Sequence, residues 1–196
     1  MQPTVALFFG SFNPIHNGHL MLARYMLNTL DINEIWFVVS PQNPFKSDTS
    51  LADASDRLEM AKLAVDNSTC MKVSDIELHL PTPSYTVNTL RALHERYPET
   101  EFSIIMGADN LSGLPNWREA QTIIDNHRIY VYPRRNVSTL HIDNEHITMV
   151  AAPQIEVSST LLRQWIANGC SIENYSPAAV VKYIEKHKLY HPIQKP

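Results

Sequence analysis

The chain has 196 residues, 44% of them hydrophobic and 18% charged, and its 16 Lys and Arg against 20 Asp and Glu give a net charge of −4. This length suffices for one domain with a substantial core. The acidic balance excludes a general attraction to nucleic acid or to an anionic membrane, and no apolar run approaches the roughly 20 residues that cross a bilayer. The start lacks a basic region, and Cys70 and Cys170 have no metal-like spacing. We therefore expect a cytoplasmic protein with reduced thiols and no signal peptide.

The chain begins with a strand, a turn, a helix and a second strand. Val5–Phe9 is a short continuous apolar run, which is typical of a buried parallel strand. Apolar residues then recur with helical spacing from His19 to Leu30, and Glu34–Ser40 is a second buried run. These elements predict a βαβ unit with a right-handed crossover.

The middle of the chain repeats this alternation. The polar, turn-rich stretch 40–50 is a loop, Ser55–Val65 is an amphipathic helix and Met71–Leu78 is a strand. A proline-punctuated loop at 79–86 then opens into a helix near Thr86–Tyr97.

The third part contains a strand at Glu101–Gly107, a helix around Trp117–Asp125 and a strand at Arg128–Tyr132. A polar, His-rich excursion over 136–148 precedes a final strand at Ile147–Ala151. Strands that alternate with helices predict an α/β fold with a doubly wound parallel sheet.

Two helices close the chain. Ser158 and Ser159 cap a helix that stops at Asn168–Gly169, and Ser176–Pro177 opens the last helix, with Ser as the cap and Pro in the first turn. We find no repeat or linker, so residues 1–196 are expected to form a single domain with a C-terminal helical part at about 157–196.

The loop after the first strand is rich in glycine, proline and histidine. It holds two of only five glycines in the chain, where average usage of about 7% would give about fourteen. Gly10 lets the backbone approach a ligand, Pro14 fixes the turn, and the helix beginning near Gly18–His19 turns free amides toward the same point. Because ligands of doubly wound sheets bind at the carboxyl ends of the strands, the loop predicts a phosphate site. It is neither a Walker A loop nor Gly-x-Gly-x-x-Gly.

His16 and His19 add two imidazole donors beside this loop. Such a pair could instead hold zinc or serve only the structure. The strand-to-helix turn, with no cysteine or third obvious ligand nearby, favours phosphate.

The segment GSFNPIHNGHL resembles the nucleotidyltransferases that share a His-x-Gly-His motif, and among them the bacterial nicotinate-mononucleotide adenylyltransferase family. The departure from the better-known form of this segment is Asn13 in place of Asp, which keeps the hydrogen-bonding shape but loses a charge. Further stretches match in family order: PQNPFK at 41–46, PSYT at 83–86, GADN at 107–110 with the later Trp117, and VSSTLLR at 157–163.

The resemblance implies a Rossmann-like nucleotidyltransferase fold and transfer of the adenylyl group of ATP to nicotinate mononucleotide, giving deamido-NAD and pyrophosphate in NAD biosynthesis. A phosphomonoester has a second pKa of about 6, so its oxygen attacks without a general base and without a covalent enzyme intermediate. The rate of the reaction then depends on the positioning of the two substrates and on the stabilisation of the negative charge on their phosphates. Mg²⁺ would enter with ATP, held mainly by phosphates, so no metal site formed by the protein is implied.

The resemblance also implies roles for individual residues. The implied catalytic residues are His16, His19, Lys46 and Arg163. The implied ATP-binding residues are Gly10, Ser11, Phe12, His19, Gly107, Asp109, Ser158, Ser159, Thr160 and Arg163. The implied residues for the mononucleotide are Asn13, Tyr85, Thr86, Trp117 and Arg135.

Physical chemistry agrees with several of these roles. Hydroxyls and free amides at a helix start, with Arg163 one turn on, suit an anion, and the amides of Tyr85 and Thr86 suit the carboxylate of nicotinate. Arg134 or Arg135, at the end of a strand, is placed to contact a phosphate, and the sequence does not choose between them.

Ordinary structural alternatives stay open. Lys46 could be a solvated surface lysine, and Trp117 could fill the core. Thr86, Asp109 and Ser158 could each act only as a helix cap.

Other functions also stay open. A pantetheine-phosphate adenylyltransferase usually has Thr in place of the first His and lacks the PSYT and Trp stretches. Specificity for nicotinamide mononucleotide and a non-catalytic nucleotide sensor are further alternatives, although a sensor would lose the charged groups at the phosphates. We expect ATP and nicotinate mononucleotide as partners, with no nucleic acid and no membrane, and the sequence leaves open whether the protein is a homo-oligomer.

Overall fold

The computed structural model describes residues 2–41, 51–134 and 144–191, and within them the chain forms a six-stranded sheet. The strand order is β3-β2-β1-β4-β5-β6, and every neighbouring pair is parallel. This arrangement confirms the predicted doubly wound α/β fold. The strands are β1 (Thr4–Gly10), β2 (Glu34–Val39), β3 (Met71–Ser74), β4 (Glu101–Gly107), β5 (Ile129–Tyr132) and β6 (Ile147–Met149).

The strand order reverses between β1 and β4, the two central strands. β1 pairs with β2 on one side, with Val5 opposite Glu34, and with β4 on the other, with Thr4 opposite Glu101. The connections that leave these two strands run to opposite sides of the sheet. They therefore open a crevice at the carboxyl ends of β1 and β4.

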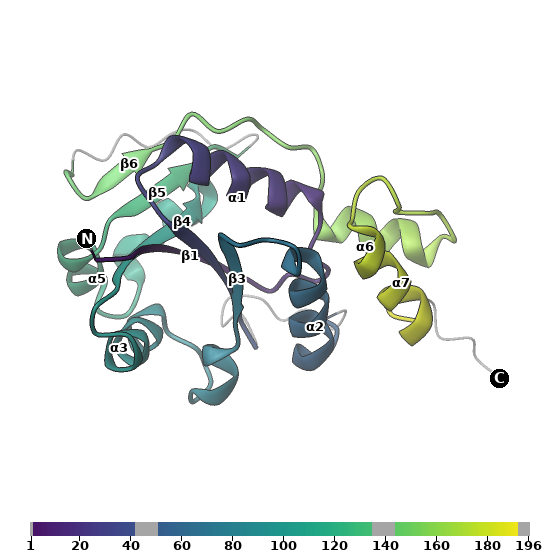
Figure 1. Ribbon diagram of the computed structural model, residues 1–196, viewed down its shortest axis with the longest axis horizontal. Helices are drawn as coiled ribbons and strands as arrows, with labels where there is room; N and C mark the ends of the chain where they lie inside the picture. The colour runs from purple at the N-terminus through teal and green to yellow at the C-terminus, as the bar shows by residue number, and fades with distance from the viewer. Residues whose placement is uncertain (1, 42–50, 135–143, 192–196) are drawn as a thin grey trace.

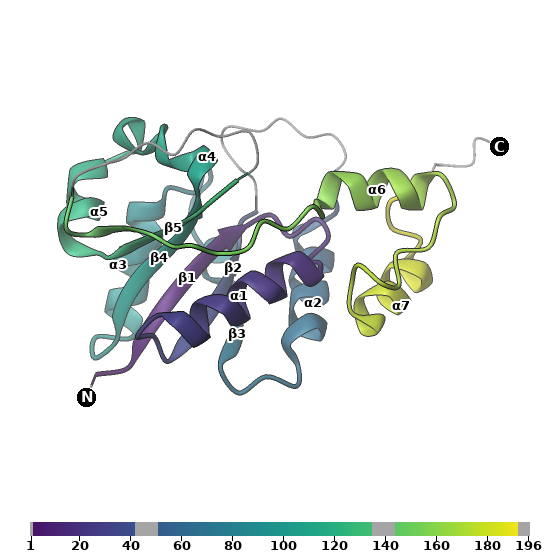
Figure 2. The ribbon, with the colours of Figure 1, turned by 90° about the horizontal axis from the view of Figure 1, so that it is seen from above.

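Helices cover both faces of the sheet. They are α1 (Asn17–Thr29), α2 (Ala54–Val65), α3 (Thr86–Arg96), α4 (Ala108–Leu111), α5 (Ala120–Asn126), α6 (Ser159–Ala167) and α7 (Ala178–His187), with the 3₁₀ helices η1 (Ile76–His79) and η2 (Leu114–Asn116). Buried residues of α1 and α2 share one hydrophobic cluster, and those of α3, α4 and α5 share a second cluster across the sheet (Figure 1). α6 and α7 stand beside the sheet, next to α2 (Figure 2). No helix in the described ranges has the length and apolar character of a membrane span.

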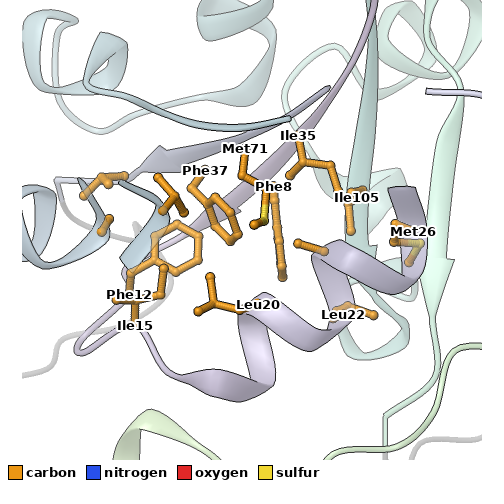
Figure 3. Packing of buried hydrophobic residues seen from close by; sticks show 14 of the residues in the cluster. Phe8, Phe12, Ile15, Leu20, Leu22, Met26, Ile35, Phe37, Met71 and Ile105 are labelled. Atoms are coloured by element: carbon orange, nitrogen blue, oxygen red, sulfur yellow. The ribbon is translucent and has the colours of Figure 1, made fainter. Parts of the chain in front are cut away.

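The core beneath the first loop is aromatic. Phe8 of β1 and Phe37 of β2 have ring centroids 5.5 Å apart, and Leu20 of α1 lies against them (Figure 3). Phe12, from the loop after β1, places its ring edge-on to both phenylalanines. Burying a side chain of this size contributes about 1.5–3 kcal/mol, so the packing of Phe12 anchors the loop to the sheet.

Predicted boundaries were wrong at several elements, and the final strand expected over Ile147–Ala151 ends at Met149. The strand expected over 71–78 ends at Ser74, because the chain turns into η1 and buries Ile76 in the second cluster. The helix expected from Trp117 begins only at Ala120, because Glu119 adopts a left-handed φ of 54°. Trp117 therefore lies in the turn between η2 and α5.

The link between α6 and α7 is bonded to the start of α1. Ser176 was expected to cap α7, but Pro177 takes the N-cap position, and the buried Oγ of Ser176 donates to the carbonyl of Ile15 at 2.7 Å. The main-chain N–H of Asn17 donates to the carbonyl of Tyr175 at 2.8 Å. The C-terminal helical part is thus held directly against the first loop.

Candidate active site

A cavity of about 750 Å³ lies at the carboxyl ends of β1, β4 and β5. Ligands of doubly wound sheets bind at this position, and residues 153–160 complete its wall. The predicted site residues that line it are Gly10, Ser11, Phe12, Asn13, His16, His19, Gly107, Asp109, Trp117, Ser158, Ser159, Thr160 and Arg163. Tyr85 and Thr86 do not line it, and Lys46 and Arg135 lie outside the described residues.

His16 and His19 stand face to face in the wall of the cavity. Their ring centroids are 3.7 Å apart and their planes differ by 24°. The main-chain N–H of His16, the N-cap of α1, donates to Nδ1 of His19 at 3.2 Å. Because this Nδ1 accepts a hydrogen bond, the neutral ring of His19 carries its proton on Nε2. The start of the helix thereby fixes which nitrogen of His19 can donate to a ligand.

Both imidazoles are neutral at pH 7 in the free protein. Burial, followed by the charge of Arg134, lowers the pKa of His16 from 6.5 to about 4. Burial also lowers the pKa of His19, followed by the charges of His16 and Arg134. Nδ1 of His16 is buried and has no hydrogen-bond partner among the described residues. Two neutral rings beside an arginine are suited to an anion, because a bound phosphate would favour their protonated forms.

Gly10 and Phe12 pack against each other where the first loop leaves β1. Phe12 has a φ of 44°, which is uncommon for a bulky residue, and its buried ring turns back toward the sheet (Figure 3). A Cβ at Gly10 would lie 2.8 Å from that ring. We expected the glycine to admit a ligand, but the Phe12 ring occupies the space. Phe12 can therefore offer a ligand its main chain rather than its ring.

Asp109 pairs with Arg134 across the end of β4. Nε of Arg134 lies 3.5 Å from the carboxylate of Asp109, and the guanidinium donates to the hydroxyl of Tyr132 at 3.0 Å. A Cβ at Gly107 would overlap the Asp109 carboxylate, so a larger residue there would push this carboxylate out of its present position. Gly107, not Asp109, is the N-cap of α4, so Asp109 is not merely a helix cap. Arg134, one of the two candidate arginines, lines the cavity, and the other, Arg135, lies outside the described residues.

The start of α6 is tied to the first loop. Ser158 caps the helix with its side chain, as predicted, and Oγ of Ser159 donates to the carbonyl of Pro14 at 2.9 Å. Arg163 donates from Nη1 to the carbonyl of Asn13 at 2.9 Å. The free amides of the first turn of α6 and the guanidinium therefore lie beside the histidine pair. Together they form a second set of anion donors at the same cavity.

The side chain of Asn13 joins the first loop to two other segments. Its buried Oδ1 accepts hydrogen bonds from the main-chain N–H of Ala52 at 3.1 Å and from the hydroxyl of Tyr190 at 2.8 Å. This oxygen bonds within the protein, and its contact with substrate stays a prediction. An uncharged amide serves these two donors without a buried charge.

Trp117 lines the cavity and Tyr85 does not, and both pack against the second cluster. Tyr85 is the N-cap of α3 and Thr86 its first residue, so free amides are present where the sequence predicted them. The guanidinium of Arg118 lies 5.1 Å from the ring centre of Tyr85. This contact joins the turn that carries Trp117 to the start of α3.

Two residues that hold the site together were not predicted. Tyr190 lies past the last helix, where no sequence pattern marks it. Arg57 of α2 donates to the carbonyl of Ser11 at 2.8 Å. It shares the buried face of α2 with Met60 and Ala61, and an arginine on an apolar helical face is a signal that the sequence offered.

Two groups of anion donors meet at the switch point of a 3-2-1-4-5-6 sheet, and this combination defines the class of α/β nucleotide-binding enzymes. The family model described as "Cytidylyltransferase-like" matches residues 7–165. The chain belongs to this family and, within it, to the nicotinate-nucleotide adenylyltransferases.

The relatives behind this assignment match nearly the whole chain. Proteins named "Probable nicotinate-nucleotide adenylyltransferase" are 44% identical over 189 residues in Flavobacterium psychrophilum and 45% identical over 193 residues in Christiangramia forsetii. These matches cover 95% and 97% of this chain and 98% and 100% of the relatives.

Solved structures show the same fold. Plasmodium falciparum nicotinic acid mononucleotide adenylyltransferase complexed with NaAD has a TM-score of 0.78 and 22% identity, and the match covers 96% of this chain and 97% of that one. The same protein complexed with APC has a TM-score of 0.77 with the same coverage.

Proposed function

We propose that this enzyme transfers the adenylyl group of ATP to nicotinate mononucleotide, giving deamido-NAD and pyrophosphate. The observation that carries the proposal is the convergence of the His16–His19 pair and the start of α6 on one cavity. A triphosphate needs donors on more than one side, and these two groups supply them. The names of the relatives at 44–45% identity support the choice of substrates.

The reaction requires little acid–base chemistry from the protein. The mononucleotide phosphate is largely dianionic at neutral pH, so one of its oxygens attacks the α-phosphorus of ATP in line and the pyrophosphate leaves as an anion. Nε2–H of His19 would donate to a phosphate oxygen, and Arg163 would stabilise the leaving group. Both contributions are electrostatic and preorganised.

Mg²⁺ is proposed to enter with ATP. Among the described residues, no three His, Cys, Asp or Glu side chains are grouped so that they could hold a metal ion. The cavity is lined by the carboxylates of Asp109, which is paired with Arg134, and of Glu156. An ion held mainly by phosphate oxygens would neutralise part of the triphosphate charge.

The mononucleotide is proposed to bind on the side of Trp117. Its pyridine ring would stack on the indole, and its carboxylate would accept hydrogen bonds from the free amides of Tyr85 and Thr86. Asp109 would bond ribose hydroxyls, Arg134 or Arg135 a phosphate, and Lys46 the triphosphate.

Release of pyrophosphate from ATP tests the proposal. We expect release that requires both Mg²⁺ and nicotinate mononucleotide, with much slower release when nicotinamide mononucleotide or phosphopantetheine replaces it. Faster turnover of either alternative would assign that substrate instead. Binding of ATP by folded protein, without release in the presence of any of the three, would indicate a nucleotide sensor.

A further inference from the structure

Arg57 of α2 is fully buried, at 0% exposure, and within the described part of the chain its hydrogen bonds all go to main-chain carbonyls. Its Nε donates to the carbonyl of Ala52 at 2.9 Å, and its Nη2 donates to that of Pro41 at 2.8 Å. Its Nη1 donates to the carbonyls of Ser11 at 2.8 Å and Ser40 at 2.7 Å. Among the described residues no carboxylate forms an ion pair with it, although arginines buried this completely are usually paired.

Three of the four carbonyls, those of Ser11, Ser40 and Pro41, follow the ends of β1 and β2, and the fourth, that of Ala52, precedes α2. The N–H of Ser40 donates to the carbonyl of Gly10 at 3.0 Å, and beyond this bond the two strands diverge. A buried carbonyl without a partner costs about 1–3 kcal/mol. The planar guanidinium of Arg57 therefore donates hydrogen bonds to carbonyls at the point where hydrogen bonding between β1 and β2 stops.

We propose that Arg57 is a positioning residue for adenylyl transfer, and that it holds the carbonyl of Ser11 so that the first loop keeps the conformation that binds the triphosphate. This inference rests on the function proposed above. Arg57 is not among the residues that line the cavity, so it acts through the loop rather than on the substrate.

The first effect of Arg57 is on the geometry of the first loop. Ser11 and Asn13 line the cavity, and the carbonyl of Asn13 accepts the hydrogen bond that places Arg163. A shift of the Ser11 peptide would therefore move donors of both anion-binding groups. A displacement of 1 Å at a reacting centre costs up to about 100-fold in rate while the fold survives.

The second effect of Arg57 is to polarise the peptide group of Ser11. A charged donor on the carbonyl of Ser11 polarises that peptide group, which makes the N–H of Phe12 a stronger hydrogen-bond donor. Burial lowers the pKa of Arg57, but an arginine keeps its charge at neutral pH because its ordinary pKa is so high. The guanidinium also adds positive charge behind a loop that would meet a triphosphate.

Arg57→Lys tests the proposal, since it keeps the charge but cannot reach four carbonyls in fork geometry. We expect a cooperatively melting protein whose kcat/KM for ATP falls at least about 30-fold, with KM for the mononucleotide changed less than about 3-fold. Arg24→Lys, at an exposed position of α1, is the matched control and should leave all constants unchanged.

The outcome that overturns the proposal is a folded Arg57→Lys variant with unchanged kinetic constants and only a lower melting temperature. Equal increases in KM for ATP and for the mononucleotide would also overturn it. Affinity for an unreactive ATP analogue is measured alongside, and we expect it to fall about 10-fold. This binding does not depend on turnover, so its result is distinct from a failure of the proposed reaction.

A measurement on the unaltered protein covers the case in which the variant does not fold. In protein with ¹⁵N-labelled arginine, the buried Nε–H of Arg57 should give a slowly exchanging signal. We expect that signal to shift when the unreactive ATP analogue binds, because the Ser11 peptide then gains a phosphate on its other side, whereas the Nε–H signal of Arg24 should not. An unmoved Arg57 signal at saturation with the analogue would contradict the proposal.

Discussion

The ring of His16 lies over the ring of His19 at 3.7 Å between centroids, while the main chain of the first residue is bonded to the ring of the second. Neither ring can turn without disturbing the other. Two stacked imidazoles also repel each other if both are protonated, so binding of one proton disfavours binding of the second. In the free enzyme the pair is therefore a rigid and neutral donor surface.

His19→Ala should lower kcat by about 100- to 1,000-fold, because it removes a donor fixed in one tautomer. The circular dichroism spectrum and the melting curve should still show a folded protein. His79→Ala is the control, since His79 is exposed on η1, where its ring contacts Asp75. Near-normal turnover of the His19 variant would refute its role.

His16 should make the stability of the enzyme depend on pH in a defined direction. Its pKa is about 4 in the folded protein and near 6.5 in the unfolded chain, so between these values the unfolded chain binds the extra proton. Stability therefore falls as the pH falls, and linkage gives a loss of about 2 kcal/mol between pH 7 and pH 5 from this residue.

The test is urea unfolding of the wild type and of His16→Gln at both pH values. The variant should lose about 2 kcal/mol less than the wild type over this interval, because glutamine does not titrate. The lowered pKa of His19 acts in the same direction, but it is present in both proteins. If the free energy of unfolding fell equally in the two proteins, the pKa of His16 would not be lowered in the folded state.

Gly18→Ala should damage the site although alanine is the better helix former. A Cβ at Gly18 would lie 2.9 Å from Nδ1 of His16 and 3.1 Å from a methyl carbon of Ile155. Propensity alone would favour the variant by up to about 1 kcal/mol, whereas overpacking costs about 1–3 kcal/mol. We expect a lower melting temperature and a kcat reduced at least about 10-fold, because the stacked ring must move. A more stable variant of normal activity would mean that the ring moves aside freely.

Trp117→Ala should act mainly on the mononucleotide. Loss of a stacking surface should raise KM for nicotinate mononucleotide about 10-fold or more, by analogy with the energies of base stacking on aromatic rings. KM for ATP should change little, because the triphosphate donors come from the first loop and α6. Steady-state kinetics with each substrate varied in turn separates the two effects, and equal increases would assign Trp117 to packing.

The sequence predicted β1, β2, β4 and β5 well because these strands are mostly buried and appear as largely apolar runs. The bounds of β4, Glu101–Gly107, were predicted to the residue. β3 was predicted too long because Ile76 and Leu78 continue an apolar pattern after the chain has left the sheet. Periodicity alone did not separate a strand from a short 3₁₀ turn there.

Much of the cavity lining was also predictable, because glycine, histidine and serine cluster at loops that share one edge of the sheet. The residues that support the cavity lining without lining the cavity themselves were not predictable in the same way. Tyr190 and Ser176 each reach one amide or main-chain oxygen far away in the sequence, and Arg57 donates to four main-chain carbonyls, three of them distant in sequence. Such bonds depend on tertiary placement and leave no local pattern, apart from the arginine on an apolar helical face.

The most direct test of the central claim, that the stacked histidines receive the phosphates of ATP, is the titration of their ring ¹⁵N signals with and without an unreactive ATP analogue. Without the analogue, the pKa of His16 should be about 4. With the analogue bound, the negative charge of the phosphates should raise the pKa values of both rings. Titration curves for His16 and His19 that do not change at saturation with the analogue would contradict the claim.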